Sequence, residues 1–133
     1  MLTHLLDTDI CIYAMKGREQ KLASRLEELS GHCAISDISL FELYAGAHRY
    51  DFPAMRLSII EDFSNRLKIL PFDSKAARIA GPIQYKLESE GQRIGNYDIL
   101  IAATALSRNL VLISKNIREF NRVPGLQVEQ WVS

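Results

Sequence analysis

The sequence predicts an α/β fold, a three-layer α/β/α sandwich in which helices cover both faces of a central, mostly parallel β-sheet. Short apolar runs alternate with longer amphipathic stretches, which is typical of parallel strands joined by helical crossovers. Apolar residues make up 47% of the chain and charged residues 24%, as in globular proteins. The length of 133 residues predicts one domain, residues 1–133, with a core of its own.

The first half of the chain predicts two buried strands, each followed by helical spacing of apolar residues. Gly17 is placed to end the first helix. Leu22, Leu26 and Leu29 share one face of the second helix. The predicted strands cover residues 2–6 and 33–35, and the predicted helices cover residues 10–16, 20–29 and 38–47.

The second half predicts three strands and four helices. Pro71 cannot donate to a β-ladder and therefore places the third strand near a sheet edge. Pro82 predicts a kink or break in a long helix beside Gly81. The run Leu-Val-Leu-Ile at residues 110–113 is the clearest strand, and we expect it near the centre. The predicted strands cover residues 68–72, 110–113 and 126–131, and the predicted helices cover residues 55–67, 74–89, 99–107 and 117–120.

Composition excludes several classes of protein. The formal net charge is zero, which gives no global electrostatic argument for nucleic-acid binding. The two cysteines, Cys11 and Cys33, lie in apolar surroundings outside any CxxC or Cys/His cluster, so we expect two reduced core thiols. No signal peptide or membrane-spanning run is visible. We therefore expect a cytoplasmic protein that does not enter membranes.

Acidic residues fall at comparable places along the predicted sheet. Asp7 follows the first strand, Glu42 lies early in the helix after the second, and Asp98 begins the helix before the fourth. Asn116 and Glu119 follow that fourth strand. Because the carboxyl ends of parallel strands line one rim, where ligands collect, these side chains can meet there.

Local structure offers other roles for the same carboxylates. Asp7 can cap the first helix by accepting hydrogen bonds from its free N–H groups, and sequence alone leaves capping and metal binding equally open. Asp98 can complement a helix dipole in the same way. Glu42 can form a capping box with Ser39, three residues earlier. If the helix instead starts near Ser36, Glu42 lies too deep to cap and must reach a cleft or a cation.

Several carboxylates on one rim suit a divalent cation. Mg²⁺ and Mn²⁺ prefer oxygen ligands, and a bound dication relieves the repulsion between carboxylates. Such an ion can activate a water molecule and stabilise the charge of a phosphodiester under attack. The three histidines follow no ligand spacing, and the chain has no glycine-rich phosphate loop.

Four stretches, in this order, resemble the PIN domain, and more narrowly the VapC toxins of bacterial type II toxin–antitoxin systems. The similarity runs nearly end to end and includes Pro124-Gly125-Leu126 and Gln130-Trp131. The four stretches run from Leu5 to Tyr13, Ile38 to Ala47, Ile94 to Ala105, and Asn116 to Phe120.

The resemblance implies an endoribonuclease that depends on Mg²⁺ or Mn²⁺, cuts single-stranded or loop RNA and thereby inhibits translation. It implies that Asp7, Glu42 and Asp98 are the catalytic acids, with Asp7 and Asp98 binding the metal directly. It also favours tRNA as the substrate, in the anticodon region of initiator tRNA.

Two positions depart from the family pattern. The fourth acidic position matches Asn116, and Glu119 is the candidate to replace it. Asp9 stands where relatives usually carry Asn or Ser, and it would bind the metal through water or raise the pKa of a neighbour. Thr8 or Asp9 would support the metal ligands by hydrogen bonding.

The resemblance also implies partners. Family members form homodimers and assemble with a small DNA-binding antitoxin, whose helix lies in a groove and directs a basic side chain towards the carboxylates. The amphipathic helices at residues 20–29 and 55–67 are candidate contact faces, although core packing explains their apolar stripes equally well. Tyr13 and Tyr97 can stack an RNA base or pack helices. The candidate phosphate-binding residues are Lys16, Arg18, Arg93, Lys115, Arg118 and Arg122.

Two other classes compete. Asp7-Thr8-Asp9 after an apolar strand also resembles the nucleophile motif of haloacid dehalogenase-like phosphatases, which need a further acidic pair downstream. A non-catalytic module with an acidic pocket, such as a phospho-receiver domain, fits the length and Lys115. A receiver also needs an aspartate at the end of its third strand, and residues 70–72 do not obviously offer one.

Overall fold

The structure is a computed structural model and describes residues 1–132. It has a five-stranded sheet of order β3-β2-β1-β4-β5, in which every neighbouring pair is parallel. The predicted mostly parallel sheet is thus confirmed, with the third strand at an edge. The strands are β1 (His4–Leu6), β2 (Cys33–Ser36), β3 (Lys68–Leu70), β4 (Val111–Ile113) and β5 (Val128–Glu129).

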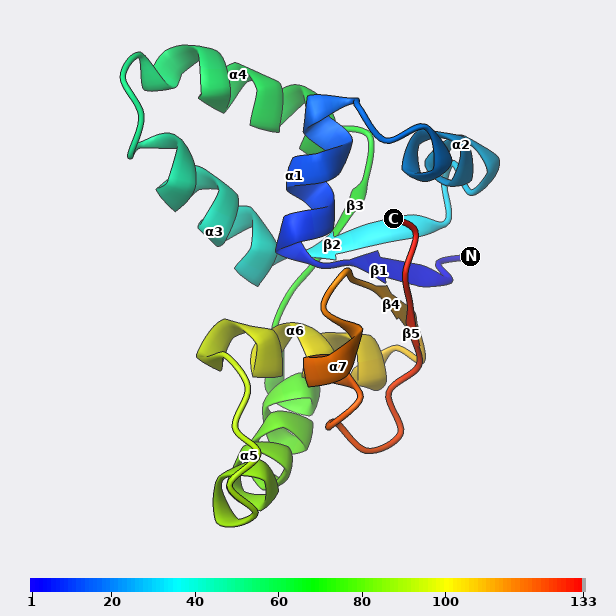
Figure 1. Ribbon diagram of the computed structural model, residues 1–133, viewed down its shortest axis with the longest axis vertical. Coiled ribbons are helices and arrows are strands. Elements are labelled where there is room, and N and C mark those ends of the chain that lie inside the picture. The colour runs from blue at the N-terminus through cyan, green and yellow to red at the C-terminus, as the bar shows by residue number, and fades with distance from the viewer. Residues whose placement is uncertain (133) are drawn as a thin grey trace.

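Seven helices connect the strands of the sheet and cover it (Figure 1). In the view of Figure 1, α1 to α4 lie above the sheet and α5 to α7 below it, so the chain forms the predicted three layers. The helices are α1 (Thr8–Lys16), α2 (Gln20–Glu28), α3 (Asp37–Ala47), α4 (Pro53–Ser64), α5 (Ser74–Ser89), α6 (Asn96–Ser107) and α7 (Ile117–Phe120).

The alternation of side chains along β1 divides the core in two. Leu5 belongs to a cluster with α5 and α6, whereas Leu6 belongs to a cluster with α1 to α4. Both side chains are fully buried, which explains why the strand is an unbroken apolar run. The middle strand therefore holds the two helical layers together. Cys11 and Cys33 are free, buried thiols in the second cluster, as expected.

The register aligns the strand ends that carry the acidic residues. Leu6, the last residue of β1, pairs with Ile35 of β2 and Ile113 of β4. The segments that begin at residues 7, 36 and 114 therefore leave the sheet side by side. This alignment builds the rim that the sequence predicts.

Three expectations about individual elements are met only in part. The break at Pro82 does not occur, and α5 runs continuously through it. Gly81 and Pro82 are exposed, so water can satisfy the carbonyl that proline leaves without a donor. The strand at residues 110–113 is interior, but the middle place belongs to β1. The last strand ends at Glu129, because the chain then leaves the sheet edge and buries Trp131.

Candidate active site

Asp7 is buried at the point where β1 ends, with 4% of its surface exposed. Its backbone N–H donates to the carbonyl of Ile113 at 3.0 Å, which ties it to the end of β4. Its Oδ1 accepts from the N–H of Ile10 at 2.9 Å, so it caps α1. The Ser114 hydroxyl also hydrogen-bonds the carboxylate. The capping bond leaves further acceptor capacity on the carboxylate, so capping and ligand binding are compatible.

Burial is the main reason why the pKa of Asp7 is raised to about 6. The hydrogen bonds from Ser114 and Ile10 oppose this effect, and the charges of Asp9 and Glu42 add to it. The carboxylate is thus held in place as a group that ionises reluctantly.

Asp98 lies in the first turn of α6 and shares the acidic environment. Its pKa is raised to about 7, first by burial and then by the charges of Asp7, Glu119, Glu42 and Asp9. The absence of a side chain at position 95 leaves room for this carboxylate, since a Cβ there would lie 2.9 Å from Oδ2 of Asp98 and would displace it. We call Asp7, Asp9, Glu42, Asp98 and Glu119 the acidic cluster.

Glu42 is held by Thr8 and does not form a capping box. Ser36 caps α3 by accepting from the N–H of Ser39 at 3.0 Å, so the interpretation that paired Ser39 with Glu42 is wrong. The Thr8 hydroxyl donates to Oε1 of Glu42 at 2.7 Å, and its oxygen lies 3.0 Å from Oγ of Ser39. A residue beside Asp7 thereby orients a carboxylate from another helix.

Asn116 and Glu119, the two candidates for the fourth acidic position, are hydrogen-bonded to each other. The backbone N–H of Asn116 donates to Oγ of Ser114 at 2.9 Å, which fixes the turn after β4. Its side-chain amide donates to Oε2 of Glu119. Glu119, whose charge raises the pKa of Asp98, thus faces the acidic cluster, while Asn116 positions it.

Asp9 is exposed on the first turn of α1, and its charge contributes to the raised pKa of both Asp7 and Asp98. This is the like-charge effect that the sequence offered as one of two consequences of the extra carboxylate. For both residues, burial raises the pKa more than the charge of Asp9 does. Asp9 is therefore a peripheral member of the acidic cluster.

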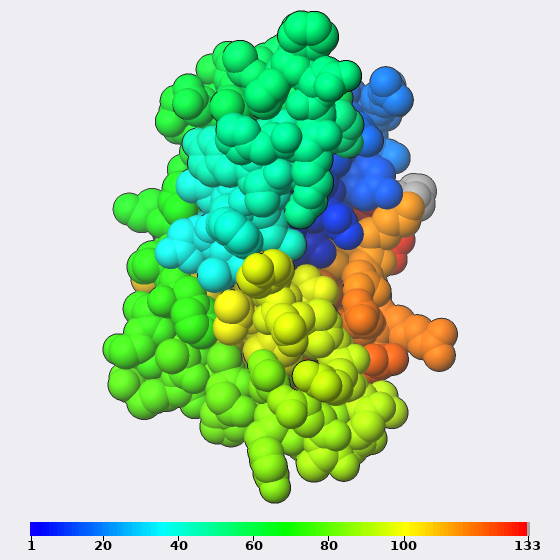
Figure 2. All heavy atoms as spheres, turned by 90° about the vertical axis from the view of Figure 1, so that its left-hand side faces the viewer, coloured from blue at the N-terminus to red at the C-terminus, as the bar shows by residue number. Residues whose placement is uncertain are grey.

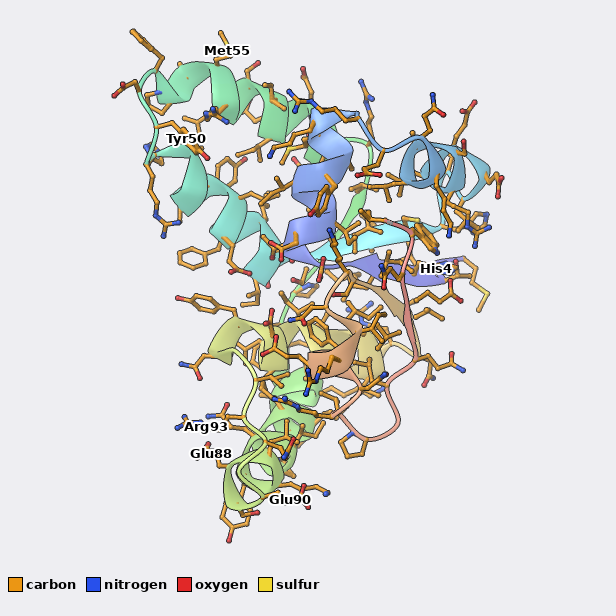
Figure 3. All side chains as sticks on the ribbon, viewed as in Figure 1. His4, Tyr50, Met55, Glu88, Glu90 and Arg93 are labelled. Atoms are coloured by element: carbon orange, nitrogen blue, oxygen red, sulfur yellow. The ribbon has the colours of Figure 1, made fainter. Side chains whose placement is uncertain are left out.

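The predicted basic residues do not share one location. Lys115 follows Ser114 and lies beside Tyr13, with Nζ 3.3 Å from the tyrosine oxygen and 5.3 Å from the ring centroid. Lys16 occupies the last turn of α1, about 12 Å along the helix axis from its start. Arg93 lies on the loop before α6, near Glu88 (Figure 3). Its carbonyl accepts from the guanidinium of Arg122. Arg18 and Arg118 are exposed.

The donor set fits a hard divalent cation. The acidic cluster offers carboxylate oxygens, and neither histidine nor cysteine contributes to it. Within residues 1–132, no group of three acidic, histidine or cysteine side chains is placed to hold a metal ion. Mg²⁺ does not require such a group, because it usually keeps several waters and binds one or two carboxylates together with substrate phosphates. Repulsion among the carboxylates supplies the reason to bind a cation.

Sequence reasoning missed Ser114 and Gly95 as parts of this site. Ser114 is fully buried and hydrogen-bonds Asp7, but a serine after a strand carries no signal of that kind. Gly95 stands three residues before an acid in a helical first turn, a spacing that could have indicated the close approach. Phe41 is exposed next to Glu42, although its helix is rich in apolar residues.

The sequence has relatives that align over almost its whole length. A PIN-domain family model matches residues 4–126. Ribonuclease VapC2 of Haemophilus influenzae is 43% identical over 132 residues, which cover 99% of this chain and 100% of the relative. The tRNA(fMet)-specific endonuclease VapC of Salmonella typhimurium is 38% identical over 131 residues, which cover 98% and 99%.

Solved structures agree with this architecture. A chain of DNA-bound VapBC from Salmonella typhimurium superposes with a TM-score of 0.94 at 38% identity, covering 98% of this chain and 99% of the other. A chain of VapBC2 from Rickettsia felis, bound to a DNA fragment from its promoter, gives a TM-score of 0.92 at 36% identity with the same coverage.

Proposed function

Because this chain belongs to the PIN-domain family and to its VapC ribonuclease group, we propose that it is the toxin of a toxin–antitoxin pair, acting as an endoribonuclease that requires Mg²⁺ or Mn²⁺. It cuts single-stranded or loop RNA and thereby inhibits translation. The whole chain, residues 1–133, acts as one nuclease domain. The observation that supports this most directly is the convergence of four further carboxylates on Asp98.

The carboxylates have different roles in this proposal. Asp7 and Asp98 would hold the metal, since burial and neighbouring charges raise the pKa of both carboxyls and a bound cation would relieve this. Glu42, oriented by Thr8, completes the site or orients the attacking water. Glu119 adds charge at the fourth position, where Asn116 holds it. When bound, the ion would activate water and stabilise the phosphate under attack.

We propose tRNA as the substrate, in the anticodon region of initiator tRNA. The support is the endonuclease of Salmonella typhimurium, which is named for tRNA(fMet) and aligns with 98% of this chain. A tRNA substrate places the protein in the cytoplasm. Within residues 1–132, the structure has no helix of the length and apolarity that a membrane crossing requires.

We further propose a small DNA-binding antitoxin as partner, and a homodimer as the toxin's own state. VapBC complexes bound to DNA are among the structural neighbours. Of the two candidate contact helices, α2 buries Leu22 in the core, whereas α4 leaves Met55 and Ile59 exposed. The exposed side of α4 is therefore the better candidate for the antitoxin.

The competing classes find no support in the structure. A receiver-like module would need an aspartate at the end of the third strand, but β3 ends at Leu70 and Asp73 caps α5. A phosphatase of the dehalogenase type would use Asp9 as a second catalytic acid, and Asp9 is exposed at the edge of the acidic cluster.

The decisive experiment incubates the protein with single-stranded RNA in Mg²⁺, with and without EDTA. We expect metal-dependent cleavage that falls at least 100-fold in Asp7→Asn and in Asp98→Asn, because even the loss of a group that only orients a metal ligand typically costs about 10- to 100-fold. Asp73→Asn is the matched control, since Asp73 caps α5 by the same 2.9 Å bond that Asp7 makes to α1. Asparagine preserves both caps.

Cleavage that persists in EDTA, or that Asp98→Asn leaves unchanged, would contradict the nuclease proposal. Mapping the cut positions in total cellular RNA then tests the tRNA assignment separately. Cuts dispersed over messenger RNA, with initiator tRNA left intact, would contradict that assignment while leaving the nuclease itself in place.

A further inference from the structure

Two aromatic side chains meet between α3 and α6. The rings of Phe41 and Tyr97 lie edge to face, with centroids 5.5 Å apart and an interplanar angle of 68°. Even in this contact 51% of Phe41 and 46% of Tyr97 remain exposed. The pair therefore presents an aromatic surface to the solvent, and we call it the aromatic pair.

Core packing does not account for these two rings. The buried face of α3 is formed by Ser39, Leu43 and Ala47, which follow one another every four residues. Phe41 lies two positions away from Ser39 and Leu43, and so points to the other side of the helix. Tyr97 lies in the first turn of α6, before its buried residues begin at position 99.

The aromatic pair borders the acidic cluster. Phe41 directly precedes Glu42, and Tyr97 directly precedes Asp98. Figure 2 shows the face on which α3 and the start of α6 meet. A nucleotide whose phosphate lies at the acidic cluster would therefore have its base within reach of the two rings.

We propose that the aromatic pair is a stacking surface for a nucleobase of the RNA substrate beside the bond that is cut, an inference that rests on the proposed function. Single-stranded RNA is commonly recognised by stacking unpaired bases on aromatic side chains, which tolerates any base. This chain has zero net charge and its acidic cluster repels phosphates, so affinity that does not depend on charge is what it needs.

The test combines ring removal with base removal. Phe41→Leu and Tyr97→Leu keep apolar bulk but lose the ring, whereas Phe41→Tyr and Tyr97→Phe keep it. The substrate is a short single-stranded RNA that carries an abasic site at each position around the cut in turn. Phe52→Leu, which removes an exposed ring at the turn before α4, is the matched control.

We expect the leucine variants to lose about tenfold in kcat/KM on intact RNA, mostly through KM, in keeping with the usual contribution of one stacked base. Wild type should lose a similar factor when one particular base is missing, and the leucine variants should lose little more. The Phe41→Tyr, Tyr97→Phe and Phe52→Leu variants should stay within about twofold. Equal losses for wild type and leucine variants at every abasic position would overturn the proposal.

A binding measurement separates this proposal from the nuclease itself. The same RNA with 2-aminopurine near the cut is titrated with protein in EDTA, where stacking on a ring quenches the fluorescence. We expect quenching by wild type, and by Tyr97→Phe, but not by Phe41→Leu or Tyr97→Leu. This result holds even if the protein cuts no RNA, whereas unchanged quenching by the leucine variants would overturn the stacking surface. A dimer that Phe41→Leu converts to monomer in sedimentation, with unchanged quenching, would assign the rings to a subunit interface.

Discussion

Two polar clusters lie near the sheet, and their charged groups are arranged in opposite ways. The acidic cluster places like charges together. The second cluster, which we call the C-terminal cluster, comprises His4, Arg25, Glu129 and Trp131. There the indole N–H of Trp131 donates to Oε1 of Glu129 at 3.1 Å, and the guanidinium of Arg25 lies 4.9 Å from the Trp131 ring centroid. His4 lies close by, with Nε2 3.9 Å from Glu129 (Figure 3).

This difference indicates that the C-terminal cluster stabilises the fold, whereas the acidic cluster is arranged for a ligand. In the C-terminal cluster Glu129 lies beside His4 and Trp131. Arg25 lies over the indole ring, so complementary groups meet there, as buried and half-buried groups generally must. In the acidic cluster, burial and then the charges of neighbouring carboxylates raise the pKa of Asp98 to about 7, so the fold stabilises this charge poorly. Perturbed groups of this kind concentrate at functional sites, where a ligand supplies what the fold leaves out.

The largest effect is expected from breaking the C-terminal cluster. Trp131 is buried among the residues that pack on α1 and α2, so Trp131→Ala removes a large side chain from the core. We expect a loss of about 3–5 kcal/mol in the free energy of unfolding. Urea denaturation measures it, with Trp131→Phe as the milder control. Cleavage by the fraction that remains folded should be unchanged, and a loss below about 1 kcal/mol would refute the structural role.

The pH dependence of stability should differ between the two clusters. For Asp7 and Asp98 the folded pKa is raised, so their contribution to stability is greatest at low pH and is lost as pH rises through about 6 to 7. For His4 burial lowers the folded pKa, so its contribution is lost as pH falls below the ordinary histidine range. The acidic cluster thus gains stability over the same acidic range in which His4 loses it.

The Asp7→Asn/Asp98→Asn double variant isolates the acidic part. Between pH 8 and pH 5, the metal-free wild type should gain about 1–3 kcal/mol relative to the double variant, with the Asp98 share reduced by solvent screening. Thermal unfolding in EDTA across this range measures the difference. Parallel curves for the two proteins would show that the fold does not raise the pKa of these two carboxyls.

The acidic residues near the ends of strands and the starts of helices could be predicted, because the order of the elements along the chain shows where they lie. Asp7 stands where β1 meets α1, and Glu42 lies in the helix that follows β2, so the register of β1 with β2 brings these two segments together. Asp98 lies in the first turn of α6, which follows α5 through a loop, and its place follows from the packing of that helix below β4. Ser114 could not be predicted, because its role depends on β1 pairing with β4, which tertiary packing decides.

Two further features that the sequence pattern does not reveal have a common physical origin. Phe41 belongs to a helix that is apolar on most sides, so periodicity could not reveal which apolar residue faces water. The alternation of residues 126–131 predicted a longer strand, but Trp131 gains more from burial against the helices than from extending an edge. In both cases the apolar pattern is present in the sequence, but packing against other parts of the fold decides which side chains are buried.

A smaller effect is expected from loosening the acidic cluster without removing a charge. Thr8→Val deletes the hydroxyl that donates to Glu42 at 2.7 Å while keeping the shape of the side chain. We expect kcat to fall about tenfold, as for other groups that orient active-site ligands. Thr8→Ser should restore most of it. A Thr8→Val enzyme with wild-type kcat would show that the bond does not orient Glu42 during the reaction.

The smallest effect should come from Arg25→Gln, which removes one charge from the C-terminal cluster but keeps much of the stem. The guanidinium lies over the Trp131 ring and is partly exposed, and a cation–π contact in such a place contributes about 0.5–1 kcal/mol. Arg25→Lys keeps a cation and should lose less. Because Arg25 also pairs with exposed Glu28, the Glu28→Gln variant measures that share separately. If Arg25→Gln costs no more than Glu28→Gln, the pairing of the arginine with the indole contributes nothing. Stability in the C-terminal cluster would then come from burial of the ring alone.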